Sequence, residues 1–175
     1  MKPRTLFTLL LGLNLCLSLA GPAAGGPPAE KKSATPAPTP VPEGPIFDQE
    51  ADGERQITDY QKVCLDSGRR LLIVFGTDDC KACRAFNRAL HKDKFFEALV
   101  NQFVPVFIDV SSGTNASLLL RYNIDPHAEQ PGIVELMPDG RVIEILAHGE
   151  MAVLARKGDA AVQEFFLARF LKTEN

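Results

Sequence analysis

The sequence contains no tryptophan, only two tyrosines and no excess of positive charge. Lysine and arginine number 19 against 22 aspartates and glutamates, which gives a formal net charge of −3. Proteins that bind nucleic acids typically carry a basic stripe or a high isoelectric point, and this composition provides neither. The hydrophobic fraction of 45% is sufficient for a buried core, and a length of 175 residues corresponds to one domain as a first expectation.

The N-terminal apolar run, residues 6–19, is shorter than the about 20 residues that a membrane-spanning helix needs. Lys2 and Arg4 precede this run, and small residues end it at Ala20. This layout predicts a secretory signal peptide over residues 1–20, and therefore a periplasmic or secreted protein. The alternative is an uncleaved anchor, and only then would the protein be attached to a membrane.

The next segment, residues 21–45, is dense in proline, alanine and glycine. Such a segment cannot bury enough apolar surface to offset the entropy lost on ordering the chain. The sequence therefore predicts an extended, disordered linker here, followed by one folded domain over residues 46–175.

Cysteine is scarce, with four residues in the chain. Cys16 lies in the predicted signal peptide, and Cys64 falls in a helical pattern where we expect a small, buried apolar side chain. Cys80 and Cys83 remain as a pair, and in an exported protein such a pair can be a static disulfide. A structural zinc site needs four ligands, whereas only His91 lies near in sequence, so no metal site is predicted.

Apolar periodicity predicts alternating helices and strands over the folded domain. The expected strands cover residues 71–75, 103–110, 133–137 and 141–147. The expected helices include residues 57–64, 80–90, 95–100, 115–122 and 162–170. Gly68 is expected to end the first helix, whereas Asp93 and Asp159 are expected to cap the third and the last. The order predicts an α/β fold whose mixed sheet of about four strands is flanked by helices, with a terminal hairpin at Pro138-Asp139-Gly140.

The Cys80–Cys83 pair follows an apolar strand that is expected to be buried on both faces, and it opens a helix. Unpaired N–H groups and the helix dipole at a helix N-terminus favour a thiolate on the first cysteine. Cys83 lies one helical turn further on, so it can close a disulfide whose short ring opens and closes reversibly. This arrangement favours thiol–disulfide exchange, with Cys80 as the nucleophile and Cys83 as the resolving thiol.

Two segments resemble the thioredoxin superfamily: Leu71–Phe86, with its Cys-Lys-Ala-Cys centre, and Gln130–Gly140. The run Gly149–Ala161 is similar to exported bacterial thioredoxin-like proteins of the disulfide isomerase kind. The resemblance covers nearly the whole domain and implies a thioredoxin fold. It further implies that Pro131 is a cis-proline that faces the cysteine pair and binds an extended substrate together with Gln130.

The chain departs from this family at three positions. Asp79 replaces a tryptophan, Gln130 replaces an apolar residue, and Val74 replaces a buried aspartate that assists the second cysteine. Glu135 interrupts an apolar strand and has two interpretations. Either it points to an uncovered face of the sheet, or it substitutes for the missing aspartate as a partly buried base in proton transfer.

Other charged residues surround the pair in sequence. Asp78 and Asp79 oppose a thiolate on Cys80, and Lys81 favours one, although a solvated loop with screened charges is the alternative. His127 precedes Pro131 and is either an ordinary loop residue or a proton shuttle, because histidine titrates near neutrality.

The sequence therefore predicts an exported thiol–disulfide oxidoreductase that exchanges disulfides with protein substrates, with the reductase or isomerase direction favoured. The redox-active group is the Cys80–Cys83 disulfide, and no other cofactor is expected. The expected partners are protein thiols and disulfides and a separate redox partner, with the chain itself a monomer. The alternative is a thioredoxin-like binding module whose disulfide is structural and idle.

Overall fold

The computed structural model describes residues 44–111 and 113–171. The predicted signal peptide and most of the predicted linker lie outside the described residues. Within these two ranges, no helix combines the length and the apolar character needed to cross a lipid bilayer.

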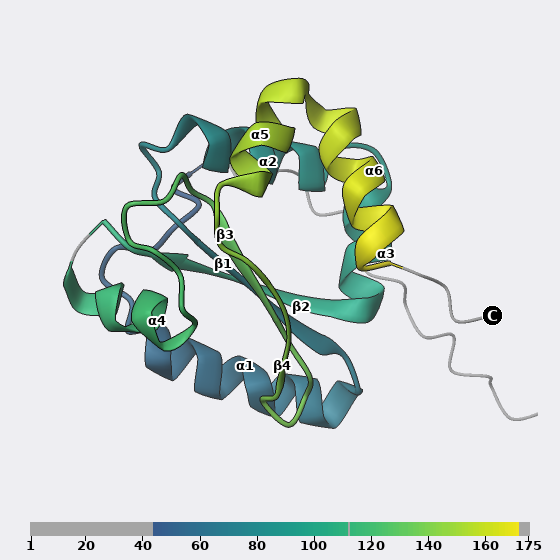
Figure 1. Cartoon of the computed structure of the whole chain (residues 1–175). Coiled ribbons are helices and arrows are strands. Elements are labelled where there is room, and N and C mark those ends of the chain that lie inside the picture. Colours follow the sequence, from purple (N-terminus) through teal and green to yellow (C-terminus); the bar gives the residue numbers. More distant parts are fainter. Residues whose placement is uncertain (1–43, 112, 172–175) are drawn as a thin grey trace, which may run out of the picture. The chain divides into compact units, whose positions relative to one another are not determined.

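A mixed four-stranded sheet forms the centre of the fold (Figure 1). Its strands are β1 (Arg70–Gly76), β2 (Phe103–Asp109), β3 (Gly132–Leu136) and β4 (Val142–Leu146), in the order β2-β1-β3-β4. β2 is parallel to β1, whereas β3 is antiparallel to both β1 and β4. The predicted mixed sheet and its terminal hairpin are confirmed.

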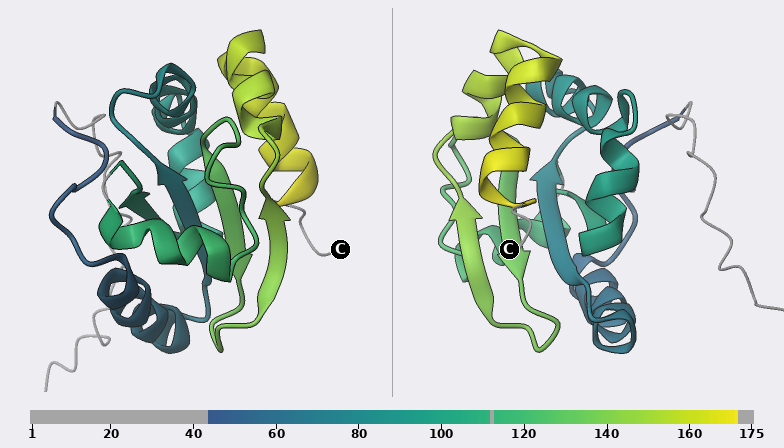
Figure 2. Two further views of the ribbon diagram at one scale, coloured as in Figure 1. Left: turned by 60° about the vertical axis from the view of Figure 1, so that its left-hand side comes forward. Right: turned by 90° about the vertical axis from the view of Figure 1, so that its right-hand side faces the viewer.

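Helices cover both faces of this sheet (Figure 2). One face carries α1 (Gly53–Ser67), a 3-10 turn (Gly113–Asn115) and α4 (Ala116–Arg121). The other face carries α2 (Lys81–His91), α3 (Phe95–Gln102), α5 (Glu150–Lys157) and α6 (Asp159–Arg169). β1 lies inside the sheet and is buried on both faces from Leu71 to Gly76, as its continuous apolar run predicts.

Two apolar cores lie on the two faces of the sheet, which we name the α2 core and the α1 core. Alternate residues of β1 enter each of them: Leu72 and Val74 enter the α2 core, and Ile73 enters the α1 core. Cys83 belongs to the α2 core and Cys64 to the α1 core. The prediction that Cys64 is a buried apolar side chain is confirmed, and burial raises the pKa of its thiol.

The first helix begins and ends as local signals dictate. The Asp52 side chain accepts a hydrogen bond from the Arg55 N–H at 3.2 Å and so caps the start of α1. Gly68 ends the helix with a left-handed φ of 71°, the conformation that favours glycine.

Two other predicted caps are wrong, and α5 is a helix that the sequence pattern does not predict. The N-cap of α3 is Lys94, and Asp93 before it has a φ of 57°. The N-cap of α6 is Gly158, and Asp159 is the first residue of the helix, where its carboxylate forms ion pairs with Arg88 and Lys92. α5 follows Gly149 without any side-chain cap, so the usual signal of a helix start is missing.

Candidate active site

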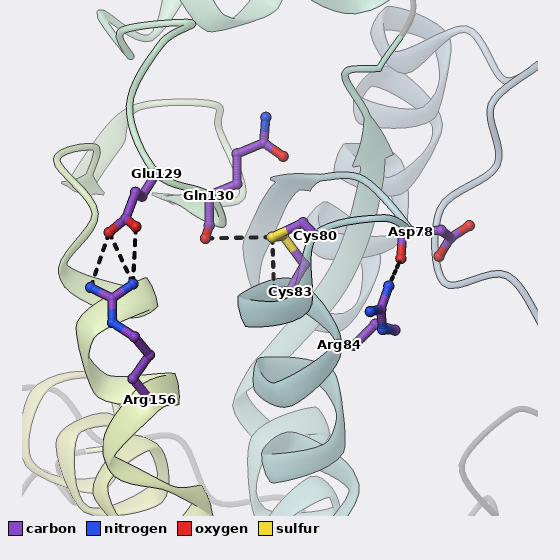
Figure 3. The surroundings of a disulfide bond; sticks show 7 residues. All are labelled: Asp78, Cys80, Cys83, Arg84, Glu129, Gln130 and Arg156. Carbon is purple, nitrogen blue, oxygen red and sulfur yellow. Dashed lines mark hydrogen bonds and ion pairs between the residues drawn. A yellow bond between two sulfur atoms is a disulfide. The ribbon is translucent and has the colours of Figure 1, made fainter.

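The two cysteines form a disulfide at the N-terminus of α2, with their Cα atoms 5.2 Å apart (Figure 3). Cys80 is the N-cap of the helix, and its Sγ accepts a hydrogen bond from the Cys83 backbone N–H at 3.0 Å. Oxygen normally fills this role, so the sulfur of Cys80 occupies the position where a helix binds an acceptor. A thiolate on Cys80 therefore receives both this hydrogen bond and the favourable end of the helix dipole.

The two sulfurs differ in exposure. Cys80 is partly exposed, whereas Cys83 is only 1% exposed and packs in the α2 core. The backbone of Gly76 reaches this buried sulfur closely: a Cβ built on Gly76 would lie 2.9 Å from Sγ of Cys83. A sulfur atom that arrives from solvent consequently meets Cys80 first.

The loop before β3 lies across from the disulfide. The Gln130–Pro131 peptide bond is cis, as the family resemblance implies. The backbone carbonyl oxygen of Gln130 lies 3.6 Å from Sγ of Cys80 (Figure 3). It is therefore the main chain of Gln130, and not its side chain, that meets the cysteine.

A mostly apolar groove of about 390 Å³ runs between Cys80 and α5. Its lining residues are Cys80, Lys81, Ala82, Glu129, Gln130, Ala152 and Arg156. Glu129 and Arg156 form a bidentate ion pair at 3.0 Å that joins the loop before β3 to α5 (Figure 3). Both of these side chains are exposed, so the pair borders the groove from the solvent side.

The loop between β1 and α2 is tied to the chain that precedes α1. Oδ1 of Asp78 accepts a hydrogen bond from the Ile46 N–H at 2.8 Å, and Arg84 donates to the Asp78 carbonyl oxygen. Asp78 therefore makes a structural contact that a fully solvated loop residue would not make. Asp79 is exposed, in keeping with that interpretation.

His127 is exposed and is not among the residues that line the groove. Its backbone N–H donates to Oδ1 of Asp125 at 2.8 Å within the same loop. The structure thus does not bring His127 to the disulfide. Within the described ranges, no group of three or more histidine, cysteine or acidic residues is placed to hold a metal ion.

Glu135 is 3% exposed and forms an ion pair with Arg70. It lies opposite Leu72 near the start of β1, whereas Cys83 contacts Gly76 at the far end of that strand. Burial raises the pKa of Glu135, and the neighbouring Arg70 guanidinium opposes that shift only in part. Glu135 therefore points neither to an uncovered face nor to Cys83, and its geometry does not support proton transfer at the disulfide.

Three residues at the site were not assigned a role from the sequence. Arg156 and Ala152 come from α5, which periodicity did not predict, although the family-like run Gly149–Ala161 contains both. Phe47 is 1% exposed and packs in the α2 core with Cys83. It lies beside the predicted linker, where no periodic pattern marks it as a core residue.

A family model described as thioredoxin-like matches residues 61–133. The disulphide isomerase from Xylella fastidiosa Temecula1 has a similar solved structure, with 28% sequence identity and a TM-score of 0.66 over 73% of this chain and 98% of that chain. The C-terminal domain of Neisseria meningitidis DsbD, in its oxidised form, matches with 20% identity and a TM-score of 0.46 over 56% of this chain and 84% of that chain. No curated protein matches the sequence. The family match, the mixed sheet and the cysteine pair at the start of α2 together show that this chain has a thioredoxin-like fold.

Proposed function

We propose that the chain is an exported thiol–disulfide oxidoreductase that acts on protein substrates in the reductase or isomerase direction. The observation that carries this proposal is the difference between the two bonded sulfurs. Cys80 is partly exposed at the helix start, whereas Cys83 is buried behind it. A purely structural disulfide has no need of such a division, but a two-step exchange does.

In the reductase direction, the Cys80 thiolate attacks one sulfur of a substrate disulfide. The substrate S–S bond breaks, a mixed disulfide with Cys80 forms, and one substrate thiolate leaves. The Cys83 thiolate then attacks Sγ of Cys80 and releases the second substrate thiolate. Two electrons pass to the substrate, the Cys80–Cys83 disulfide forms, and a separate redox partner reduces it for the next turnover. In the isomerase direction, a substrate thiolate displaces Cys80 before Cys83 reacts.

The groove beside Cys80 supports a protein substrate. Its surface is mostly apolar, and the Gln130 carbonyl lies at its edge next to the reactive sulfur. An extended segment of another chain can meet both a main-chain group and an apolar surface there. The similar solved structure named as a disulphide isomerase supports the same class of substrate.

Export is supported by the N-terminal sequence. Lys2 and Arg4, the apolar run 6–19 and the small residues that end at Ala20 follow the order of a secretory signal peptide. N-terminal sequencing of exported material is expected to begin near Gly21. Recovery of the chain with Met1 intact in a membrane fraction would instead favour the anchor.

Redox titration of the full chain in glutathione buffers tests whether the disulfide cycles. Structural disulfides of secreted proteins have potentials below about −300 mV, so glutathione does not reduce them appreciably. We expect the Cys80–Cys83 pair to titrate within the buffer range. A pair that stays oxidised throughout would make this chain a redox-idle binding module.

A trapping experiment tests the order of attack. In Cys83→Ser the resolving thiol is missing, so mixed disulfides through Cys80 are expected to accumulate with substrate proteins. In Cys80→Ser the remaining thiol is buried, and little trapping is expected. Equal trapping by the two variants would contradict the assignment of Cys80 as the nucleophile.

A further inference from the structure

Two buried carboxylates lie among the described residues, Asp109 and Glu135. Arg70 forms an ion pair with Glu135. Asp109 is 0% exposed, and its Oδ1 accepts hydrogen bonds from the backbone N–H and the hydroxyl of Ser111. Oδ2 of Asp109 has no partner, and it is the one buried side-chain oxygen or nitrogen in that state within the described part of the chain. Burying a polar atom without a partner is costly, so Asp109 calls for a functional explanation.

Asp109 lies at the end of β2, opposite Gly76 of β1. β1 and β2 are parallel and pair Gly76 with Asp109 and Val74 with Phe107. Side chains alternate along a strand, and both Val74 and Phe107 pack into the α2 core. The Asp109 carboxyl, two residues after Phe107, therefore points to the same face of the sheet as Cys83.

Gly76 links the two groups, and the ring of Phe47 packs against it beside Cys83. A Cβ on Gly76 would lie 2.9 Å from Sγ of Cys83, and Gly76 is the strand partner of Asp109. Neighbouring strands are about 4.8 Å apart. The carboxyl of Asp109 and the sulfur of Cys83 thus lie on the same face of the sheet, each next to Gly76. A general base acts from such a position when it reaches the thiol directly or through one water molecule.

We propose that the Asp109 carboxylate accepts the proton of Cys83 when Cys83 resolves the mixed disulfide on Cys80. This inference rests on the proposed function and names the proton acceptor for its second step. The Cys83 S–H proton passes to Asp109, and the resulting thiolate forms the bond to Sγ of Cys80. The bond between Cys80 and the substrate sulfur breaks, the substrate thiolate leaves with the electron pair, and Asp109 then returns its proton to solvent or to that thiolate.

The surroundings of Cys83 explain why an acceptor is needed. Its neighbours in the α2 core are apolar, including Phe47, Val74 and Phe86. An apolar environment disfavours the charged thiolate, so Cys83 needs a nearby base to become a nucleophile near neutral pH.

The other titratable and charged groups around the redox centre have different positions or partners. They are Asp48, Asp78, Asp79, Lys81, Arg84, His127, Glu129, Glu135 and Arg156. Asp78 bonds to the Ile46 N–H, and Glu129 pairs with Arg156. Asp48, Asp79, Lys81, Arg84 and His127 are exposed, and Glu135 lies at the opposite end of β1. Among these groups and Asp109, only Asp109 is both buried and placed beside Gly76.

The test follows the reduced full-length chain as it reacts with the aromatic disulfide dithiobis(nitrobenzoic acid), by stopped-flow absorbance over a range of pH. Attack by Cys80 releases one thionitrobenzoate, and resolution by Cys83 releases a second. The first phase therefore reports on Cys80 and the second on Cys83. Cys83→Ser shows the first phase alone, together with any signal from the other cysteines, and its trace is subtracted.

Asp109→Asn keeps the shape of the side chain but cannot accept the proton. Its second phase is expected to slow by at least about tenfold near neutral pH and to recover at high pH, where Cys83 ionises without help. Its first phase is expected to keep the wild-type rate. Glu135→Gln is the matched control, since it removes the other buried carboxylate of this sheet face, and it is expected to leave the second-phase profile unchanged.

Ser111→Ala gives an independent result should Asp109→Asn not fold. The variant removes the hydrogen bond that the Ser111 hydroxyl donates to the Asp109 carboxylate. Loss of this bond favours the protonated form of the carboxyl group. The acidic limb of the second-phase profile is therefore expected to move to higher pH. An unchanged profile in the folded variants, or a slowing by one constant factor at every pH, overturns the proposal. A wild-type chain that shows no second phase overturns the exchange function itself, and the role of Asp109 with it.

Discussion

Gly76 and Cys83 are in contact at a point where no side chain fits. A Cβ at position 76 would lie 2.9 Å from Sγ of Cys83 and 2.6 Å from Cζ of Phe47. Gly76 is not among the glycines with positive φ, so its backbone conformation does not explain the glycine. The close approach does, because the end of β1 is packed directly against the buried sulfur.

Gly76→Ala is therefore expected to strain the redox centre. Inserting a methyl group into a well-packed core typically costs about 1–3 kcal/mol, so the free energy of unfolding should fall by that amount. Urea unfolding of the oxidised chain measures this change. Gly113→Ala is the matched control, since a Cβ there meets nothing within 4 Å. Equal stability of the two variants would show that Phe47 and Cys83 move aside freely.

The ion pair between Glu129 and Arg156 is expected to tune Cys80 rather than to hold the fold. Both partners are exposed, and such pairs contribute about 0–1 kcal/mol. In Glu129→Gln, Arg156 loses its counter-charge beside the groove and should favour a thiolate on Cys80.

Iodoacetamide alkylation of reduced Cys80 at mildly acidic pH measures this effect. The reaction should be faster in Glu129→Gln than in the wild type, and added salt should reduce the difference, because exposed charges are screened. Glu164→Gln, an exposed change on α6, serves as the control and is expected to leave the rate unaltered. A salt-independent acceleration would point to a structural change instead of a charge effect.

The sequence predicted the parts of this fold that local patterns determine. The apolar run of β1, the Gly68 stop and the position of Cys80 at a helix start depend on residues close to one another in the chain. α5 depends on packing instead, because Met151 and Ala152 are buried against α2 and the helix lacks a side-chain cap.

The choice between two carboxylates shows where prediction from the sequence ended. Glu135 stands out in the sequence because it interrupts an apolar strand. Asp109 does not stand out, because it follows the last apolar residue of its strand. Which of them lies near Cys83 depends on strand register, which pairs Glu135 with Leu72 and Asp109 with Gly76. Register is a tertiary property, so only the structure shows which buried carboxylate lies at the end of the sheet near Cys83.

Arg70 is expected to stabilise the fold in a pH-dependent way through Glu135. Removing one partner of a buried ion pair leaves an uncompensated charge, so Arg70→Met should lose about 3 kcal/mol of unfolding free energy at neutral pH. Burial already raises the pKa of Glu135, and loss of the guanidinium would raise it further. A raised carboxyl pKa favours the folded state at low pH and disfavours it as pH rises through that pKa. The deficit of Arg70→Met should therefore shrink as Glu135 becomes protonated.

Urea unfolding at a series of pH values measures this deficit. Arg169→Met is the matched control, because Arg169 pairs with Glu144 at the surface and is half exposed. Its loss should be within about 1 kcal/mol and should depend little on pH. A deficit of Arg70→Met that stays constant down to acidic pH would mean that Arg70 acts through its bonds to Gln102 and Phe170, or its stacking on Phe103, and not through Glu135.

Phe47 is expected to act as the cover of the buried cysteine. Its ring fills the space next to Gly76, packs edge-on against Phe107 and is held in place by the neighbouring Ile46–Asp78 hydrogen bond. Phe47→Ala should cost about 3–5 kcal/mol, as other core truncations of phenylalanine do, and should also open a path to Cys83. The rate of Cys83 alkylation in a Cys80→Ser background measures that path.

Lost stability alone also speeds alkylation, so the control must be destabilised to a similar degree. Phe95→Ala meets this need, because Phe95 is a buried ring of the same α2 core but packs on Phe166. Both variants should unfold at lower urea concentration, whereas only Phe47→Ala should expose Cys83 under native conditions, where local opening and not global unfolding limits the reaction. Equal alkylation rates at equal stability would mean that Cys83 is protected by the fold as a whole, and that the chain before α1 has no separate role in covering it.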